Sequence, residues 1–76
     1  MERLKPLFAK VLDIQESQVN DGLTRKQFEP WDSFNHLMLI SALEKELSIS
    51  FTMDEVEKIR TFKELSDLVM GKLGSR

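Results

Sequence analysis

The apolar side chains of this 76-residue chain recur at the spacing of amphipathic helices, and nowhere do they alternate as they would in a half-buried strand. The first run predicts a helix over roughly residues 3–14, whose apolar side is formed by Leu4, Leu7, Phe8, Val11 and Leu12. A second run, Leu39, Ile40, Leu43 and Leu47, has the same helical period. The pattern therefore predicts an all-α fold.

Capping residues mark where the later helices begin. Asp32 is a good N-cap and predicts a second helix that runs to about Leu47. Thr52 and Glu55 have the spacing of a capping box, in which each side chain accepts a backbone N–H of the other residue. That box predicts a short third helix, which ends near Ile59.

A second capping box, Thr61 with Glu64, predicts a fourth helix that ends at Gly74. Between the first two helices, residues 15–31 have no period, and this length is unusual for a loop in a compact domain. We expect four apolar residues to hold the loop against the core: Val19, Leu23, Phe28 and Trp31.

These elements predict a four-helix bundle with three longer helices, one short third helix and a long first loop. We expect residues 1–76 to form a single domain, because so short a chain buries too little surface for two. The predicted core consists of Phe8, Val11, Leu12, Leu39, Leu43, Leu47, Phe62, Leu65 and Leu68.

Composition excludes several classes of function. The chain has no Cys and one His, so thiolate and His-rich metal sites are excluded and we expect no bound metal. The longest apolar run, Leu37–Ile40, is far too short to span a membrane or to serve as a signal peptide. We expect a monomeric cytoplasmic protein that is not an enzyme, since a substrate-sized cavity would consume most of so small a core.

Charge is unevenly distributed along the chain. Residues 31–59 hold six acidic and two basic side chains, a net charge of −4. This segment suits a basic protein surface and repels nucleic-acid phosphate. One interpretation of the whole sequence is therefore an unmodified four-helix interaction module that binds a basic partner through residues 31–59, and a nucleic-acid binder is disfavoured.

The second helix has apolar residues on two sides. Leu39, Ile40, Leu43 and Leu47 share one side, which we assign to the core. Phe34, Leu37 and Met38 lie on another side, near the start of the helix, and we call them the apolar patch. Either this patch is an exposed docking surface, with Leu37 and Met38 the better candidates, or Phe34 packs under the long loop.

Ser33 and His36 stand three residues apart on this helix, which suggests a nucleophile and its base. No third residue is placed to orient the imidazole, so we favour a partly buried structural His or a partner contact. Acid–base catalysis by the carboxylates is not supported either, because no cavity is predicted that would raise their pKa values.

The segment Trp31-Asp32-Ser33-Phe34 places a hydroxyl at the start of a helix after a long loop. Here the sequence resembles the acyl carrier proteins over nearly its whole length. The resemblance rests on the Asp-Ser-(bulky apolar) motif, on residues 39–47, and on Ile49 and Phe51 in the turn that follows. It implies an acyl-carrier type of four-helix bundle.

The resemblance also implies a function. Ser33 would carry a covalent 4′-phosphopantetheine arm derived from coenzyme A, and Asp32 would be its motif neighbour. Acyl groups (fatty, polyketide-like or other carboxylic groups) would be held as thioesters on the arm and presented to partner enzymes. The implied partners are a phosphopantetheinyl transferase, an acyl-loading ligase or acyltransferase, and condensing or acyl-transferring enzymes. The residues expected to contact them are Asp32, Phe34, Leu37, Met38, Glu44, Glu46 and Glu57.

This chain departs from the family's usual pattern at several positions. Phe34 stands where Leu is most common, and Asn35, His36 and Met38 make the first turns of the second helix less acidic than in carriers of bulk fatty-acid synthesis. The departures favour a specialised carrier. Because aminoacyl and peptidyl carriers share the fold and the serine, such a carrier remains an alternative.

Overall fold

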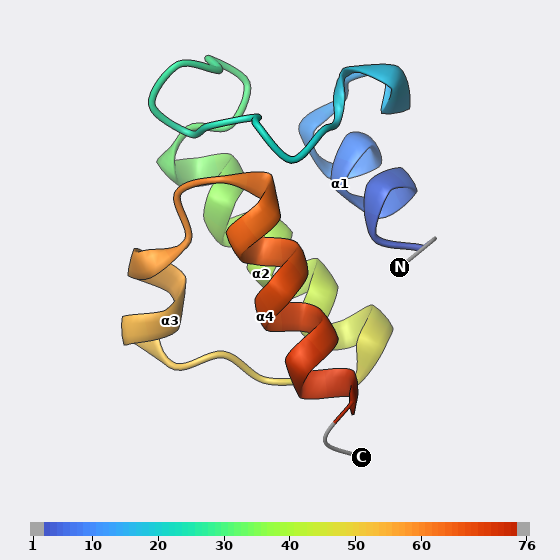
Figure 1. Cartoon of the computed structure of the whole chain (residues 1–76), viewed down its shortest axis with the longest axis vertical. Helices are drawn as coiled ribbons and strands as arrows, with labels where there is room; N and C mark the ends of the chain where they lie inside the picture. Colours follow the sequence, from blue (N-terminus) through green and yellow to red (C-terminus); the bar gives the residue numbers. More distant parts are fainter. Residues whose placement is uncertain (1–2, 75–76) are drawn as a thin grey trace.

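The computed structural model describes residues 3–74, and its elements follow one another as predicted (Figure 1). A single 3-10 turn, η1, lies in the long first loop, and α3 is the short helix of the four. The elements are α1 (Leu4–Leu12), η1 (Glu16–Gln18), α2 (Ser33–Leu47), α3 (Met53–Lys58) and α4 (Phe62–Gly74). The all-α architecture predicted from the sequence is confirmed.

The predicted caps begin the helices. The Asp32 carboxylate accepts a hydrogen bond from the Asn35 N–H at 2.8 Å and so caps α2. The Thr52–Glu55 capping box is formed at the start of α3. At the start of α4 the box is reciprocal: Thr61 Oγ1 accepts the Glu64 N–H, and Glu64 Oε1 accepts the Thr61 N–H, both at 3.1 Å.

Two helices end at residues whose backbone turns left-handed, although neither residue is glycine. Asp13 has φ 57° and ends α1 at Leu12, two residues before the predicted end of that helix. Ser48 has φ 55° and ends α2 after Leu47, as predicted. α4 is described as far as Gly74, the residue predicted to end it, and residues 75–76 lie outside the described part of the chain.

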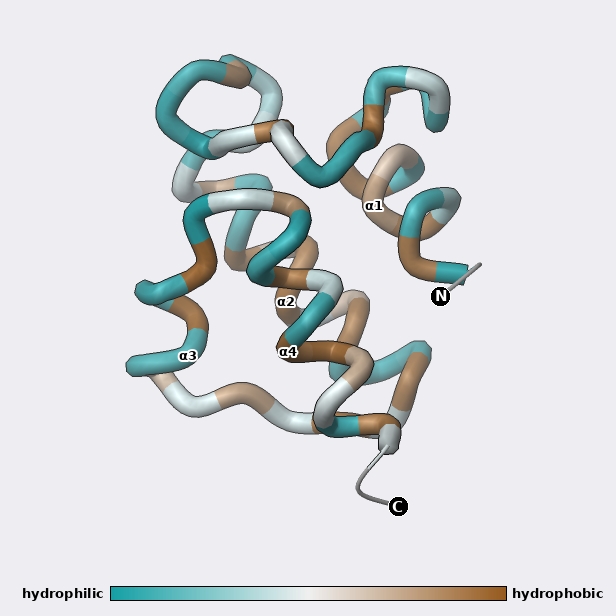
Figure 2. Tube along the Cα trace, viewed as in Figure 1, coloured by the Kyte–Doolittle hydropathy of each residue, from teal (hydrophilic) through white to brown (hydrophobic). Residues whose placement is uncertain are grey.

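One core joins α1, α2 and α4, and its hydrophobic residues recur along these helices as brown bands in Figure 2. Of the nine predicted core residues, seven are buried, and Val11 and Leu68 are half-buried against them. Phe8 lies at the centre, with its ring edge-to-face against Trp31 (centroids 4.9 Å apart) and Phe62 (5.1 Å).

The long loop is held against the core by the predicted residues. Val19 and Trp31 are buried, while Leu23 and Phe28 are half-buried and contact the same core. The loop also forms an isolated antiparallel bridge with the α3–α4 connection, at Thr24 and Thr61. This pairing of residues far apart in sequence fixes the loop close to the start of α4.

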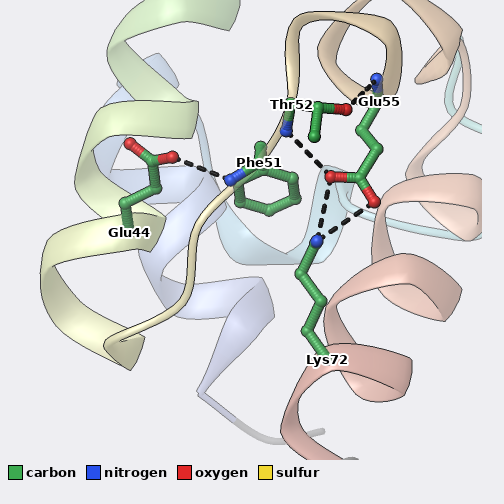
Figure 3. A network of polar contacts seen from close by, with 5 residues as sticks. All are labelled: Glu44, Phe51, Thr52, Glu55 and Lys72. Atoms are coloured by element: carbon green, nitrogen blue, oxygen red, sulfur yellow. Dashed lines mark hydrogen bonds and ion pairs between the residues drawn. The ribbon is translucent and has the colours of Figure 1, made fainter.

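Polar contacts tie the α2–α3 connection to α2, and tie the start of α3 to α4 (Figure 3). Glu44 Oε2 accepts the Phe51 N–H at 2.9 Å, and Lys72 of α4 donates to Glu55 Oε1 at 2.9 Å. The Lys72 ammonium also lies 5.2 Å from the centre of the Phe51 ring. The hydrogen bond from Lys72 lowers the pKa of the Glu55 carboxyl, and the Thr52 N–H contributes in the same direction.

Within residues 3–74, no helix is both long enough and apolar enough to cross a membrane.

The core assignment predicts a specific loss of stability. Leu43 is fully buried, so Leu43→Ala should lower the free energy of unfolding by about 2–5 kcal/mol, which is a large part of the stability of so small a domain. Urea unfolding followed by circular dichroism measures this difference. The matched control is Leu37→Ala on the exposed side of the same helix, which should change stability by less than about 0.5 kcal/mol. Equal losses in the two variants would show that α2 faces the other way.

Candidate functional site

Ser33 is the first residue of α2, and its side chain is exposed. It directly follows the N-cap Asp32 and the end of the long loop. Because α2 has 15 residues, its peptide dipoles make the space around Ser33 favourable for a negative charge. The site therefore presents a solvent-accessible hydroxyl where an attached phosphate would be stabilised.

Two open grooves meet at Ser33. The larger groove, about 710 Å³, is lined by loop residues 24–27 and by the α3–α4 connection, including Arg60. The smaller groove, about 440 Å³, lies between α2 and α3 and includes Leu37 and Met53. Arg25, Ser33 and Glu57 line both grooves. An extended group attached to Ser33 would therefore have a surface to lie against on either side.

Directly behind Ser33, a buried chain of hydrogen bonds connects three segments. The Trp31 indole Nε1–H donates to His36 Nδ1 at 3.0 Å, and His36 Nε2 lies 2.9 Å from the Val56 carbonyl oxygen. Because an indole nitrogen can only donate, Nδ1 must accept and the imidazole proton resides on Nε2, which donates to Val56. His36 is 2% exposed, more deeply buried than the sequence predicted.

This environment keeps His36 neutral. Burial is the main cause that lowers the pKa of the imidazole, and the positive charge of Arg25 acts in the same direction, whereas the bond to the Val56 carbonyl raises it. Both ring nitrogens are engaged with Trp31 and Val56, so neither can take a proton from Ser33. The structural interpretation of His36 is therefore favoured over the nucleophile–base pair.

The apolar patch is exposed. Phe34 is 71% accessible, Leu37 56% and Met38 50%, so Phe34 does not pack under the loop. Met53, at the start of α3, is 68% exposed and lines the smaller groove together with Leu37. Sequence analysis did not single out Met53, since a residue just inside a capping box carries no periodic signal of its own.

The acidic residues that were predicted to contact partners lie in different parts of the structure. Glu57 lines both grooves at Ser33, and Asp32 lines the larger one. Glu44 is half-buried and bonded to the Phe51 N–H, which gives it a structural role. Glu46 lies near the end of α2 and lines a different groove with Arg3 and Lys10. The structure thus gathers Asp32, Phe34, Leu37, Met38 and Glu57 around the start of α2, and places the other two elsewhere.

The comparisons with known proteins agree with this architecture. The family model described as "Phosphopantetheine attachment site" matches residues 2–69. Two acyl carrier proteins from Buchnera aphidicola (subsp. Acyrthosiphon pisum, strains 5A and Tuc7) are each 31% identical over 71 residues, which is 93% of this chain and 89% of theirs. The solution structure of a holo acyl carrier protein from Geobacter metallireducens superposes with a TM-score of 0.86 at 31% identity, and covers 97% of this chain and 85% of that one.

These matches define a phosphopantetheine-bearing carrier with the acyl-carrier type of four-helix fold. The chain belongs to the acyl carrier protein family, whose members carry acyl groups on a covalent 4′-phosphopantetheine arm. The residues at the start of α2 fit such an arm, because an exposed hydroxyl lies between two open grooves with basic side chains from the loop beside it.

The buried imidazole predicts how stability depends on pH. In the unfolded chain His36 titrates near its ordinary pKa of 6.5, and folding lowers that pKa. Between that lowered value and 6.5 the unfolded chain binds more protons, so the free energy of unfolding should fall as the pH drops through 6.5 towards the lowered value. Urea unfolding across this range measures the slope, and His36→Gln, which cannot titrate, should show a smaller slope.

A second measurement does not depend on the variant. His36 is the single histidine of the chain, so NMR of its imidazole carbons reports this titration alone. We expect a midpoint below 6.5 in the folded protein. A midpoint at or above that value would contradict the buried neutral imidazole.

Proposed function

We propose that Ser33 is the residue that bears the 4′-phosphopantetheine arm, joined through its Oγ to the phosphate. The observation that carries this proposal is the position of the hydroxyl: it is exposed at the first residue of α2 and lines both grooves. The Asp32-Ser33-Phe34 motif, which resembles that of the family, supports the same assignment. Because the chain contains no Cys, the thiol that holds the acyl group would be that of the arm.

We further propose that the protein is a carrier and not an enzyme. Its partners would be a phosphopantetheinyl transferase that uses coenzyme A, a ligase or acyltransferase that loads the arm, and condensing or acyl-transferring enzymes. The family as a whole works with transferases and acyl-handling enzymes. A single domain over residues 1–76, a monomeric state and a cytoplasmic location stay predictions from the sequence.

The surface proposed to dock onto these partners is the apolar patch with Met53, flanked by Asp32 and Glu57. Its exposed apolar side chains adjoin Ser33, so a partner seated there would have its active site near the arm. Glu46 and Glu44 stay predicted contacts, although Glu44 is occupied by the Phe51 N–H. A specialised cargo is part of the proposal and is supported by two exposed residues. Phe34 stands where Leu is most common in the family, and Met38 makes the first turns of α2 less acidic than in carriers of bulk fatty-acid synthesis.

Substitution of the serine tests the attachment site. Ser33→Ala should fold normally, because Asp32 caps α2 and Ala is a good helix residue, but it should accept no arm. Intact mass spectrometry after incubation with coenzyme A and a broad-specificity phosphopantetheinyl transferase measures loading. The matched control is Ser41→Ala, an exposed position two turns further along α2, which should load as the wild type does. Loading of Ser33→Ala would refute this site, and an unmodified folded wild type would favour the interaction module.

The docking surface can be tested with the same transferase as the probe. Leu37→Asp and Met38→Asp should each slow modification about tenfold, because an apolar contact at the centre of an interface contributes more than ~1 kcal/mol. Met70→Asp is the control, since Met70 is 51% exposed on α4. Circular dichroism checks that all three variants fold. If Met70→Asp slows modification as much as the patch variants, recognition does not depend on this surface.

A further inference from the structure

Arg25 holds a fixed position beside Ser33. Its backbone N–H donates to the Arg60 carbonyl oxygen at 2.9 Å, as part of the bridge between the long loop and the α3–α4 connection. Its side-chain Nη1 donates to the Ile59 carbonyl oxygen at 3.0 Å. Main chain and guanidinium are therefore both attached to the same connection, and the side chain is preorganised rather than free in solvent.

This guanidinium has no ion-pair partner within the described part of the chain. The ion pairs found among residues 3–74 join Lys63 to Asp67 and Lys72 to Glu55, and none includes Arg25. The Arg25 Nε is buried without a hydrogen-bond partner. This buried Nε is not accessible from the grooves, but the rest of the guanidinium uses one N–H on the Ile59 carbonyl and has no acidic partner among these residues, so a half-buried cation of this kind would gain from an anion bound in the groove.

The two grooves place this cation next to the attachment residue. Arg25 and Ser33 line the larger and the smaller groove alike, whereas Lys26 and Arg60 line only the larger one. Lys26 and Arg60 are also exposed. Among the basic residues that line the larger groove, Arg25 alone also lines the smaller groove with Ser33.

We propose that the Arg25 guanidinium binds the phosphodiester of the arm on Ser33 and so fixes where the arm leaves the protein surface. This inference rests on the proposed attachment at Ser33. A phosphodiester carries one negative charge, and the guanidinium donors match phosphate oxygens in a bidentate arrangement that a lysine cannot reproduce. The Asp32 and Glu57 carboxylates line the larger groove as well, and their repulsion of the phosphate makes a compensating cation there more valuable.

A four-way comparison of apo and holo proteins tests the proposal. Attachment of the arm should raise the melting temperature of the wild type at low salt, and this gain should disappear in Arg25→Gln. Lys26→Gln is the matched control, because it removes the same charge from an exposed residue of the same groove; it should keep the gain. Arg25→Lys should keep only part of it, and added salt should reduce the gain in the wild type.

NMR of the wild type gives a second measurement in case Arg25→Gln does not fold. The Nε–H resonance of Arg25 should shift between apo and holo protein, while that of Arg60 should shift less. An equal gain in Arg25→Gln, or an Arg25 resonance that does not move in the holo protein, would overturn the proposal.

The anion could instead belong to the cargo. We would load the holo protein with butyryl or succinyl groups, which differ by a terminal carboxylate. An Arg25 resonance that moves only with succinyl overturns the phosphodiester assignment, while a shift already complete in the unloaded holo protein supports it. A wild type that several transferases leave unmodified overturns the attachment at Ser33, and with it this inference. Mass spectrometry therefore distinguishes the two failures: it shows whether the arm is absent from the protein, or is attached without any effect on Arg25.

Discussion

The hydrogen bonds from Trp31 through His36 to the Val56 carbonyl determine how the start of α2 is held. They connect the end of the long loop, the first turn of α2 and the short α3 inside the core, where water cannot replace a lost partner. The same arrangement requires a neutral imidazole, because a second ring proton would face the indole N–H. Ser33 lies on the outside of this junction, so its backbone is held by the buried contacts of its neighbours while its side chain remains exposed.

Such a junction would suit the attachment proposed at Ser33, since every partner would then find the arm at the same place relative to the surface that it recognises. α2 serves both needs. Leu39 and Leu43 bury one side of the helix in the core, and Phe34 and Leu37 leave another side open beside Ser33. Residues that do not contribute to folding are thus available for docking. Because these apolar side chains stay exposed, they contribute little hydrophobic burial to the stability of the isolated protein, and an exposed apolar patch of this kind is typical of an interaction site.

Interactions within a few residues could be predicted from the sequence, and longer-range ones could not. The Asp32 cap and both capping boxes join residues three apart, so residue type and spacing predict them well. By contrast, Arg25 meets Ile59 across 34 positions, and His36 meets Val56 across 20. Neither pair leaves a periodic signal. The early end of α1 at Leu12 was missed for another reason: Asp13 adopts the left-handed conformation that glycine usually supplies.

The acidic segment shows why net charge along a sequence differs from charge on a surface. Residues 31–59 sum to −4, yet Glu55 is neutralised by Lys72, and Glu44 is occupied by a backbone N–H. Near Ser33, Asp32 and Glu57 face Arg25, Lys26 and Arg60 across the larger groove, which leaves this groove slightly positive. The charge around Ser33 is therefore mixed, although the sequence segment that contains Ser33 is acidic. If the docking surface proposed above is correct, its exposed apolar side chains distinguish this end of the molecule, and a partner with an apolar contact surface would fit it better than a strongly basic one.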